Sequence, residues 1–194
     1  MTLSICLVLL LGPLSLTESQ SRAMIPELSA KLSEAGVKLR VRRIKVMQDP
    51  TGVSGLADRR QKFNRVMGLA SILRRRLKEC RPNAILLQTG PLIEGTTTYL
   101  HGYSSEVCAR RKRGVIGGVS QASGVEHNQN GEPRLNQSVI AMTHESLHLC
   151  GAFDNSIPAN VMNLGALEYV KEYGLSLPVL PLTVSQVRAC MKGI

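Results

Sequence analysis

The chain has 194 residues, 43% of them hydrophobic, which fits one domain with a buried core and excludes a largely disordered chain. With two Phe, four Tyr and no Trp, it lacks the aromatic side chains on which single-stranded nucleic acids stack. The formal net charge of +10 favours polyanionic partners, among them sulfated glycans, although solvated basic faces of helices and strands are the more common reason for such a charge.

The N-terminal segment opens with an apolar run from Leu3 to Leu16, which is short for a membrane span of about 20 residues. We interpret residues 1–20 as a secretory signal peptide, which leaves 21–194 as the mature domain and predicts an extracellular protein with no membrane span. No Lys or Arg precedes the run, so a buried strand over Ser4–Leu11 is the competing interpretation.

The cysteines fit export. Removal of residues 1–20 would take Cys6 away and leave Cys80, Cys108, Cys150 and Cys190. An even number of cysteines in an exported chain permits disulfides, but their spacing does not give the connectivity.

The first half of the chain alternates helix and strand patterns. Residues 25–35 have apolar side chains at helical spacing, and Gly36 ends that pattern. Residues 37–41 alternate as a half-buried strand does, and such a strand can continue through Ile44 and Val46. Residues 56–80 predict a long basic amphipathic helix, which Pro82 terminates.

The second half continues this alternation. The predicted elements are a buried strand at 84–87, a loop at 90–102, a strand at 115–119, a loop at 123–133, a helix at 139–149, an irregular tail at 155–181 and a short helix at 184–191. This order predicts an α/β fold, with the chemistry on the last long helix.

The motif that carries chemistry begins with His144, Glu145 and His148. Two histidines four residues apart on a helix point from the same face, so both imidazoles can reach one zinc ion. Glu145 points elsewhere around the helix, but its carboxylate can reach a water molecule on the metal. A carboxylate there takes the proton of that water and generates a nucleophile for a peptide carbonyl.

The residues after this helix extend the motif. Gly151, three residues after His148, can adopt a left-handed conformation and end the helix in a sharp turn. The turned chain can return Asp154 to the metal as a third ligand, which leaves the open position that catalysis needs. Met162 follows eight residues later and can form a tight turn beneath the site.

This stretch, HExxHxxGxxD followed by Met, resembles the metzincin pattern HExxHxxGxxH…Met, with Asp154 where the third His usually stands. The resemblance implies a zinc metalloendopeptidase of protein or peptide substrates, with Zn²⁺ on His144, His148 and Asp154 and a zinc-bound water activated by Glu145. It also implies a metzincin-like α+β catalytic domain over 21–194. Such a domain has a mixed twisted sheet packed on helices, an active-site helix and an irregular C-terminal subdomain.

Three further segments, at 84–90, 102–108 and 111–117, are similar to the reprolysin (adamalysin, ADAM-like) branch and to secreted salivary metalloproteases of blood-feeding arthropods. This narrower resemblance implies a disulfide between Cys108 and Cys190. Cys150 stands where the family normally has an apolar residue, and it is either a buried thiol or the partner of Cys80.

Two alternatives stay open. Either Ser4–Leu11 is the first strand of the family fold in an N-terminally incomplete chain, or the domain lacks that strand. Asp154 in place of the usual His and the net charge of +10 also allow a different interpretation. In it, the chain is a catalytically inactive secreted protein that keeps the fold and binds partners through its basic surface. His101 and His127 have no ligand spacing with the helix and are expected at the surface, and no nucleic-acid partner is expected.

Overall fold

The structure is a computed structural model of the chain. It describes residues 1–11, 15–48, 68–69, 72–73, 75–80, 84–88, 92–94, 98–100, 102–104, 111–112, 115–116, 120–123, 134–163 and 165–192.

Among the described residues, the centre of the molecule is a mixed seven-stranded sheet in the order β6-β9-β3-β1-β8-β7, with β2 paired to β1. Its strands are β1 (Thr2–Leu11), β2 (Lys38–Gln48), β3 (Ala84–Gln88), β6 (Gly102–Ser104), β7 (Arg111–Lys112), β8 (Val115–Ile116) and β9 (Ser120–Ser123). Strand β1 is parallel to β2, β3 and β8, and β3 is parallel to β9. Strand β6 runs antiparallel to β9, and strand β7 runs antiparallel to β8. A separate hairpin joins β4 (Leu92–Glu94) and β5 (Thr98–Leu100).

Strand β1 is buried on both of its faces, which explains why its sequence is a continuous apolar run. Side chains alternate along a strand, so Leu7 and Leu9 enter the core on one face, and Val8 and Leu10 pack with Leu69 on the other. Cleavage after residue 20 would remove this central strand. Residues 2–11 therefore form the strand of the competing interpretation, and the signal peptide stays a prediction.

A disulfide also fixes this segment to the body of the chain. Cys6, within β1, is bonded to Cys80 at the end of the 3-10 helix η2 (Lys78–Cys80). Under the signal-peptide interpretation Cys6 leaves the mature chain, so the sequence does not predict this pairing. Of the two alternatives for Cys150, the buried thiol is confirmed, and the pairing with Cys80 is wrong because Cys80 is bonded to Cys6.

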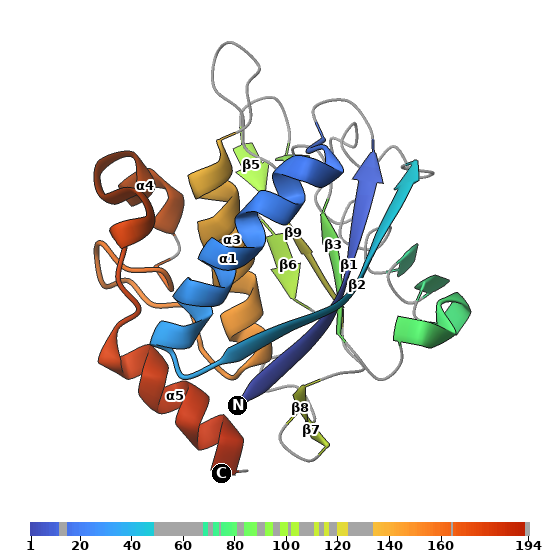
Figure 1. The fold of residues 1–194 in the computed structure, drawn as a ribbon. Coiled ribbons are helices and arrows are strands. Elements are labelled where there is room, and N and C mark those ends of the chain that lie inside the picture. Colours follow the sequence, from blue (N-terminus) through green and yellow to red (C-terminus); the bar gives the residue numbers. More distant parts are fainter. Residues whose placement is uncertain are drawn as a thin grey trace.

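Two helices cover one face of the sheet. Helix α1 (Glu18–Glu34) and helix α3 (Leu135–Leu149) lie beside each other on that face (Figure 1). Helix α1 begins at Thr17, whose hydroxyl accepts from the Gln20 N–H while the Gln20 carboxamide accepts from the Thr17 N–H. The C-terminal part adds α4 (Ala166–Tyr173), the 3-10 helix η3 (Gly174–Ser176) and α5 (Pro181–Lys192).

The predicted α/β architecture, a mixed sheet on helices, is confirmed. The strand at 84–87 and the helices at 139–149 and 184–191 correspond to β3, α3 and α5. The loop prediction at 90–102 is wrong where β4 and β5 form, and the tail predicted as irregular contains α4. The helix predicted at 56–80 and the loop predicted at 123–133 lie mostly outside the described residues.

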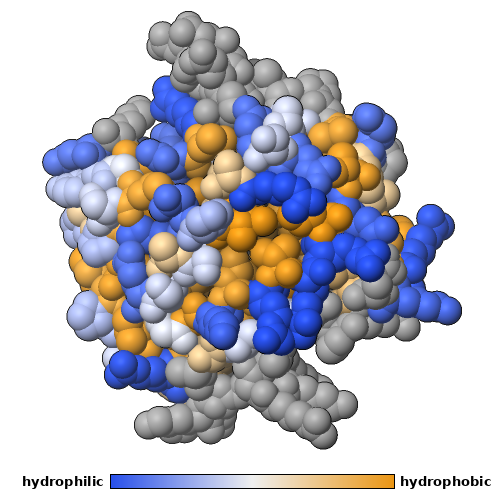
Figure 2. Space-filling view, in the orientation of Figure 1, coloured by the Kyte–Doolittle hydropathy of each residue, from blue (hydrophilic) through white to orange (hydrophobic). Residues whose placement is uncertain are grey.

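Figure 2 shows hydrophobic residues at the surface in the middle of one face, where α1 lies beside β2, with hydrophilic residues around them. The partly buried Leu39, Val41 and Ile44 of β2 pack against the core, while Arg40, Arg42 and Arg43 of the same strand are exposed. Among the described residues, no helix is both long and apolar enough to cross a membrane.

Candidate metal centre

Helix α3 carries two of the three predicted metal ligands. His144 and His148 lie one turn apart, and their side chains are 15% and 12% exposed. Most of the helix is buried, including Glu145. A buried helix holds its side chains in fixed directions, so the two imidazoles have a rigid base.

Gly151 turns the chain back after α3, as the sequence predicts. Its φ is +101°, in the left-handed region. The Ala152 N–H donates to the Leu147 carbonyl and the Gly151 N–H donates to the His148 carbonyl, both at 2.9 Å. This pair of bonds is the Schellman motif that ends many helices. We call the residues after it, 152–163, the metal loop.

The metal loop brings Asp154 to the two histidines. Asp154 Oδ1 lies 3.0 Å from His144 Nε2 and 3.4 Å from His148 Nε2, and the two Nε2 atoms are 3.1 Å apart. Four-coordinate zinc with ligand atoms at 2.0–2.1 Å places those atoms about 3.3 Å apart. The triangle of two imidazole nitrogens and one carboxylate oxygen therefore matches the face that a tetrahedral zinc ion requires.

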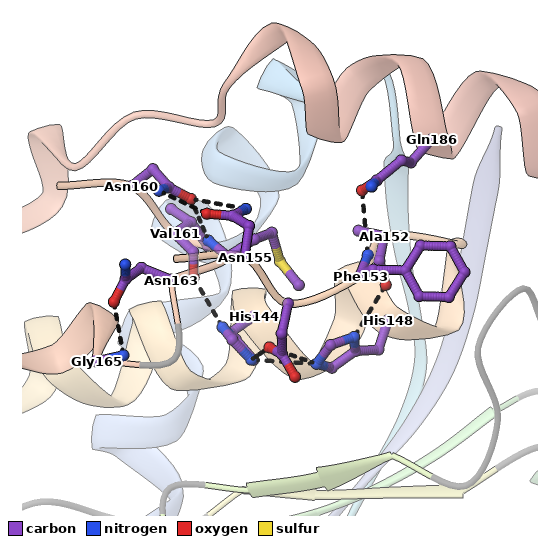
Figure 3. Close-up of polar contacts among 12 residues, drawn as sticks. His144, His148, Ala152, Phe153, Asn155, Asn160, Val161, Asn163, Gly165 and Gln186 are labelled. Carbon is purple, nitrogen blue, oxygen red and sulfur yellow. Dashed lines mark hydrogen bonds and ion pairs between the residues drawn. The ribbon is translucent and has the colours of Figure 1, made fainter. Parts of the chain in front are cut away.

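The other nitrogen of each imidazole points at a backbone carbonyl. His144 Nδ1 lies 2.8 Å from the Val161 oxygen, and His148 Nδ1 lies 2.9 Å from the Ala152 oxygen. A carbonyl only accepts, so both Nδ1 atoms must carry the hydrogen. Each Nε2 then presents its lone pair to the centre, as a metal ligand must. Figure 3 shows both rings beneath the metal loop.

The electrostatics of the cluster favour positive charge at its centre. Burial lowers the pKa of His144, but the hydrogen bond to Asp154, the charge of Glu145 and the Val161 carbonyl together raise it above its usual value. The hydrogen bond from His144 holds the pKa of Asp154 below its usual value, although burial opposes this. Groups that stabilise a protonated imidazole would also stabilise a divalent cation in the same place.

Three asparagines shape the metal loop. The side-chain oxygens of Asn155, Asn160 and Asn163 each accept the backbone N–H two residues further on, at 3.1, 2.9 and 2.7 Å. These are Asx turns, in which a side chain replaces a backbone turn partner. Asn160 is fully buried and also donates to the Asn155 side chain and to the Ile157 carbonyl. The loop is therefore fixed by hydrogen bonds at closely spaced points.

Helix α5 supports the N-terminal end of the metal loop, at Phe153. Gln186 accepts from the Phe153 N–H at 3.1 Å. A Cβ placed on Gly151 would overlap the Cβ of Cys190, so the two residues are in close contact. The sequence motif does not include Asn155, Asn160 or Gln186. The density of asparagines after the helix was a usable signal for the first two, whereas no local pattern marks Gln186.

The remaining predicted residues divide into two groups. Burial raises the pKa of the Cys150 thiol to about 12, and its sulfur belongs to the core, not to the metal cluster. Cys190 is disulfide-bonded, and its predicted partner Cys108 lies outside the described residues. His101 and His127 also lie outside them. Among the described residues, the group that could hold a metal consists of His144, His148 and Asp154.

Sequence comparison does not place the chain: no family profile matches it, and no curated protein matches it. Its fold is similar to metalloproteinase-II from Bacteroides fragilis, with a TM-score of 0.63 at 16% identity over 97% of this chain. This chain spans about half of that protein, 52% of its length.

Two smaller structures match along nearly their whole length. Archaemetzincin from Methanopyrus kandleri has a TM-score of 0.59 at 16% identity, covering 98% of this chain and 96% of that one. A zinc-dependent peptidase from Methanocorpusculum labreanum has a TM-score of 0.58 at 18% identity, covering 94% and 99%. The chain thus shares the fold of these three proteins, at identities that establish the fold alone.

Proposed function

We propose that the chain is a zinc-dependent metalloendopeptidase, with His144, His148 and Asp154 as ligands and Glu145 as the catalytic base. The observation that carries the proposal is the triangle of ligand atoms with sides of 3.0, 3.1 and 3.4 Å. The size of the triangle and its donor atoms fit a catalytic zinc site with three protein ligands. The tautomer with the hydrogen on Nδ1, which leaves each Nε2 lone pair facing the centre, fits such a site too. The fold shared with zinc metallopeptidases supports the same proposal.

Glu145 would transfer the proton as general base and then as general acid. It lies beside His144 in α3, and its negative charge acts on that imidazole. His144, His148 and Asp154 would hold Zn²⁺, which as a Lewis acid would lower the pKa of water and polarise a peptide carbonyl. The Glu145 carboxylate accepts the proton of the attacking water and returns it to the leaving amine. The helical turn directs Glu145 away from the ligand direction of His144 and His148, so its carboxylate is placed to act on water and not as a further ligand.

A peptide substrate would bind as an added strand. Strand β6 (Gly102–Ser104) ends the sheet order, is antiparallel to β9, and packs with β9 against α3. Backbone groups at such an edge can pair with an extended chain. An extended peptide along β6 would pass the helix that carries the histidines, consistent with protein or peptide substrates.

An oxidising compartment is also proposed. The Cys6–Cys80 disulfide and the disulfide-bonded Cys190 are typical of exported proteins. The reprolysin-like subgroup and sulfated glycans as partners remain predictions from the sequence.

The test of the catalytic role is Glu145→Gln, assayed for cleavage of a casein-type substrate. The amide keeps the size of the side chain but does not accept a proton, so we expect cleavage to fall by about 10²–10⁴-fold while the bound zinc is retained. Glu168→Gln, at an exposed position of α4, is the control and should cleave as the wild type does.

Unchanged cleavage in Glu145→Gln would refute its role as base. Wild-type protein that holds zinc and cleaves no substrate would instead favour the alternative of a non-catalytic binding protein with this fold.

A further inference from the structure

His148 is held by a peptide group that is itself held by a side chain. His148 Nδ1 donates to the Ala152 carbonyl at 2.9 Å. The N–H of the same peptide group belongs to Phe153, and it donates to Gln186 Oε1 at 3.1 Å. A carboxamide, a peptide group and an imidazole thus form one hydrogen-bonded chain that ends at the metal centre.

His144 repeats this arrangement through a different part of the metal loop. His144 Nδ1 donates to the Val161 carbonyl at 2.8 Å. The N–H of that peptide group, on Met162, donates to Asn160 Oδ1 at 2.9 Å. Figure 3 shows the two carboxamides, Asn160 and Gln186, in the upper part of the view and the two imidazoles below them.

The planarity of the peptide group links the two hydrogen bonds in each chain. Because the N–H and the C=O are fixed in one plane, a bond that fixes the N–H also fixes the direction of the carbonyl. Hydrogen bonds in series also polarise one another, so an acceptor at the N–H makes the carbonyl a better acceptor. A firmly placed carbonyl in turn sets the tautomer and the orientation of its histidine.

The two carboxamides come from different environments. Asn160 is fully buried within the metal loop, where it donates to the Asn155 side chain and to the Ile157 carbonyl. Gln186 is half-buried on α5, outside the loop. Gln186 therefore makes the C-terminal helix part of the support of the metal centre.

We infer that Asn160 and Gln186 are positioning residues for the metal site, each acting through one peptide group on one histidine. This inference rests on the proposed zinc site and extends it beyond the ligands. Gln186 controls the orientation of His148 and Asn160 that of His144, so removing either acceptor weakens metal binding at one identified ligand.

Gln186 gives the cleaner test because its side chain is half-buried. Gln186→Met removes the acceptor and keeps the length of the side chain, and Gln186→Ser is too short to reach Phe153. Gln186→Glu keeps an acceptor oxygen at the same place. The control is Gln20→Met in α1, which loses the same kind of bond, from the Thr17 N–H to a glutamine oxygen, at a helix cap.

Zinc affinity is measured by competition with a chelator, alongside thermal unfolding of each variant. We expect the zinc Kd of Gln186→Met and Gln186→Ser to rise by about 10-fold, the lower end of the effect of losing an outer-shell partner. Gln186→Glu should recover most of this loss. Gln20→Met should unfold at a lower temperature and keep the wild-type zinc Kd.

A zinc Kd unchanged in Gln186→Met would overturn the inference and leave the proposed function standing. Equal weakening in Gln186→Met and Gln20→Met would overturn it too, because the effect would then follow stability. Wild-type protein that binds no zinc would overturn the proposed function itself.

A second measurement identifies the histidine affected. The chain has four histidines, and their ring nitrogens are distinguishable by long-range ¹H–¹⁵N NMR. In zinc-loaded protein, Gln186→Met should shift the ring signals of His148 and leave those of His144 in place. Equal shifts at both rings, or none at His148, would contradict the assignment of Gln186 to His148.

Discussion

Strand β1 and the metal loop are held by different forces. In β1, Leu3, Leu7 and Val8 are at most 1% exposed and are fixed by packing on both faces of the sheet. The metal loop has an exposed Phe153 and Asp154 and is fixed by side-chain oxygens that accept backbone N–H groups. Packing sets the stability of the domain, whereas the hydrogen bonds of the loop set the geometry of the metal site. The two regions should therefore respond differently to substitution.

The largest effect on stability is expected from the disulfide. Cys6 and Cys80 are 74 residues apart, and in the chain-entropy model closing such a loop contributes about 4 kcal/mol to the free energy of unfolding. The double variant Cys6→Ala/Cys80→Ala should lose about that much in denaturant titrations. Its zinc affinity in the folded state should stay that of the wild type. A lower zinc affinity in the double variant would show that the structure around β1 also sets the geometry of the metal loop.

A cavity in β1 should act in the same way with a smaller effect. Leu7 is 1% exposed, so Leu7→Ala is expected to lower the free energy of unfolding by about 3 kcal/mol through lost packing. Leu182→Ala removes the same atoms at a position that is 45% exposed and should cost below about 0.5 kcal/mol. Similar losses in the two variants would mean that β1 is not the buried centre of the fold.

A substitution at Gly151, directly before the metal loop, should affect both stability and metal binding. Gly151→Ala combines a positive φ with overlap at Cys190, and we expect a loss of about 2 kcal/mol and weaker zinc binding. Gly36 has φ +75° with no atom within 4 Å of an added Cβ. Gly36→Ala therefore isolates the backbone cost, about 1 kcal/mol, and should leave zinc affinity unchanged. Equal effects on zinc in the two variants would show that the overlap at Cys190 has no influence on the site.

The sequence predicted the local features of the site better than its support. Residue spacing on one helix placed His144 and His148 on one face, and Gly151 marked the turn that brings Asp154 back. These are short-range properties of the chain. Gln186 contacts the peptide of Phe153, 33 residues away, and such a contact exists only in the folded domain.

The fold shows the same division. The strand β3 and the helices α3 and α5 follow from hydrophobic periodicity, and the mixed sheet follows from their order. The apolar run of β1 is ambiguous, because a strand buried on both faces and the hydrophobic part of a signal peptide have the same composition. The Cys6–Cys80 pairing depended on resolving that ambiguity.

The zinc content of purified wild-type protein, measured beside that of Asp154→Ala, tests the central claim most directly. The triangle formed by His144 Nε2, His148 Nε2 and Asp154 Oδ1 predicts one zinc ion per chain in the wild type. In Asp154→Ala the zinc affinity should fall by more than about 100-fold, beyond the loss of an outer-shell partner. No zinc in the wild type, or zinc held equally well without Asp154, would contradict the account.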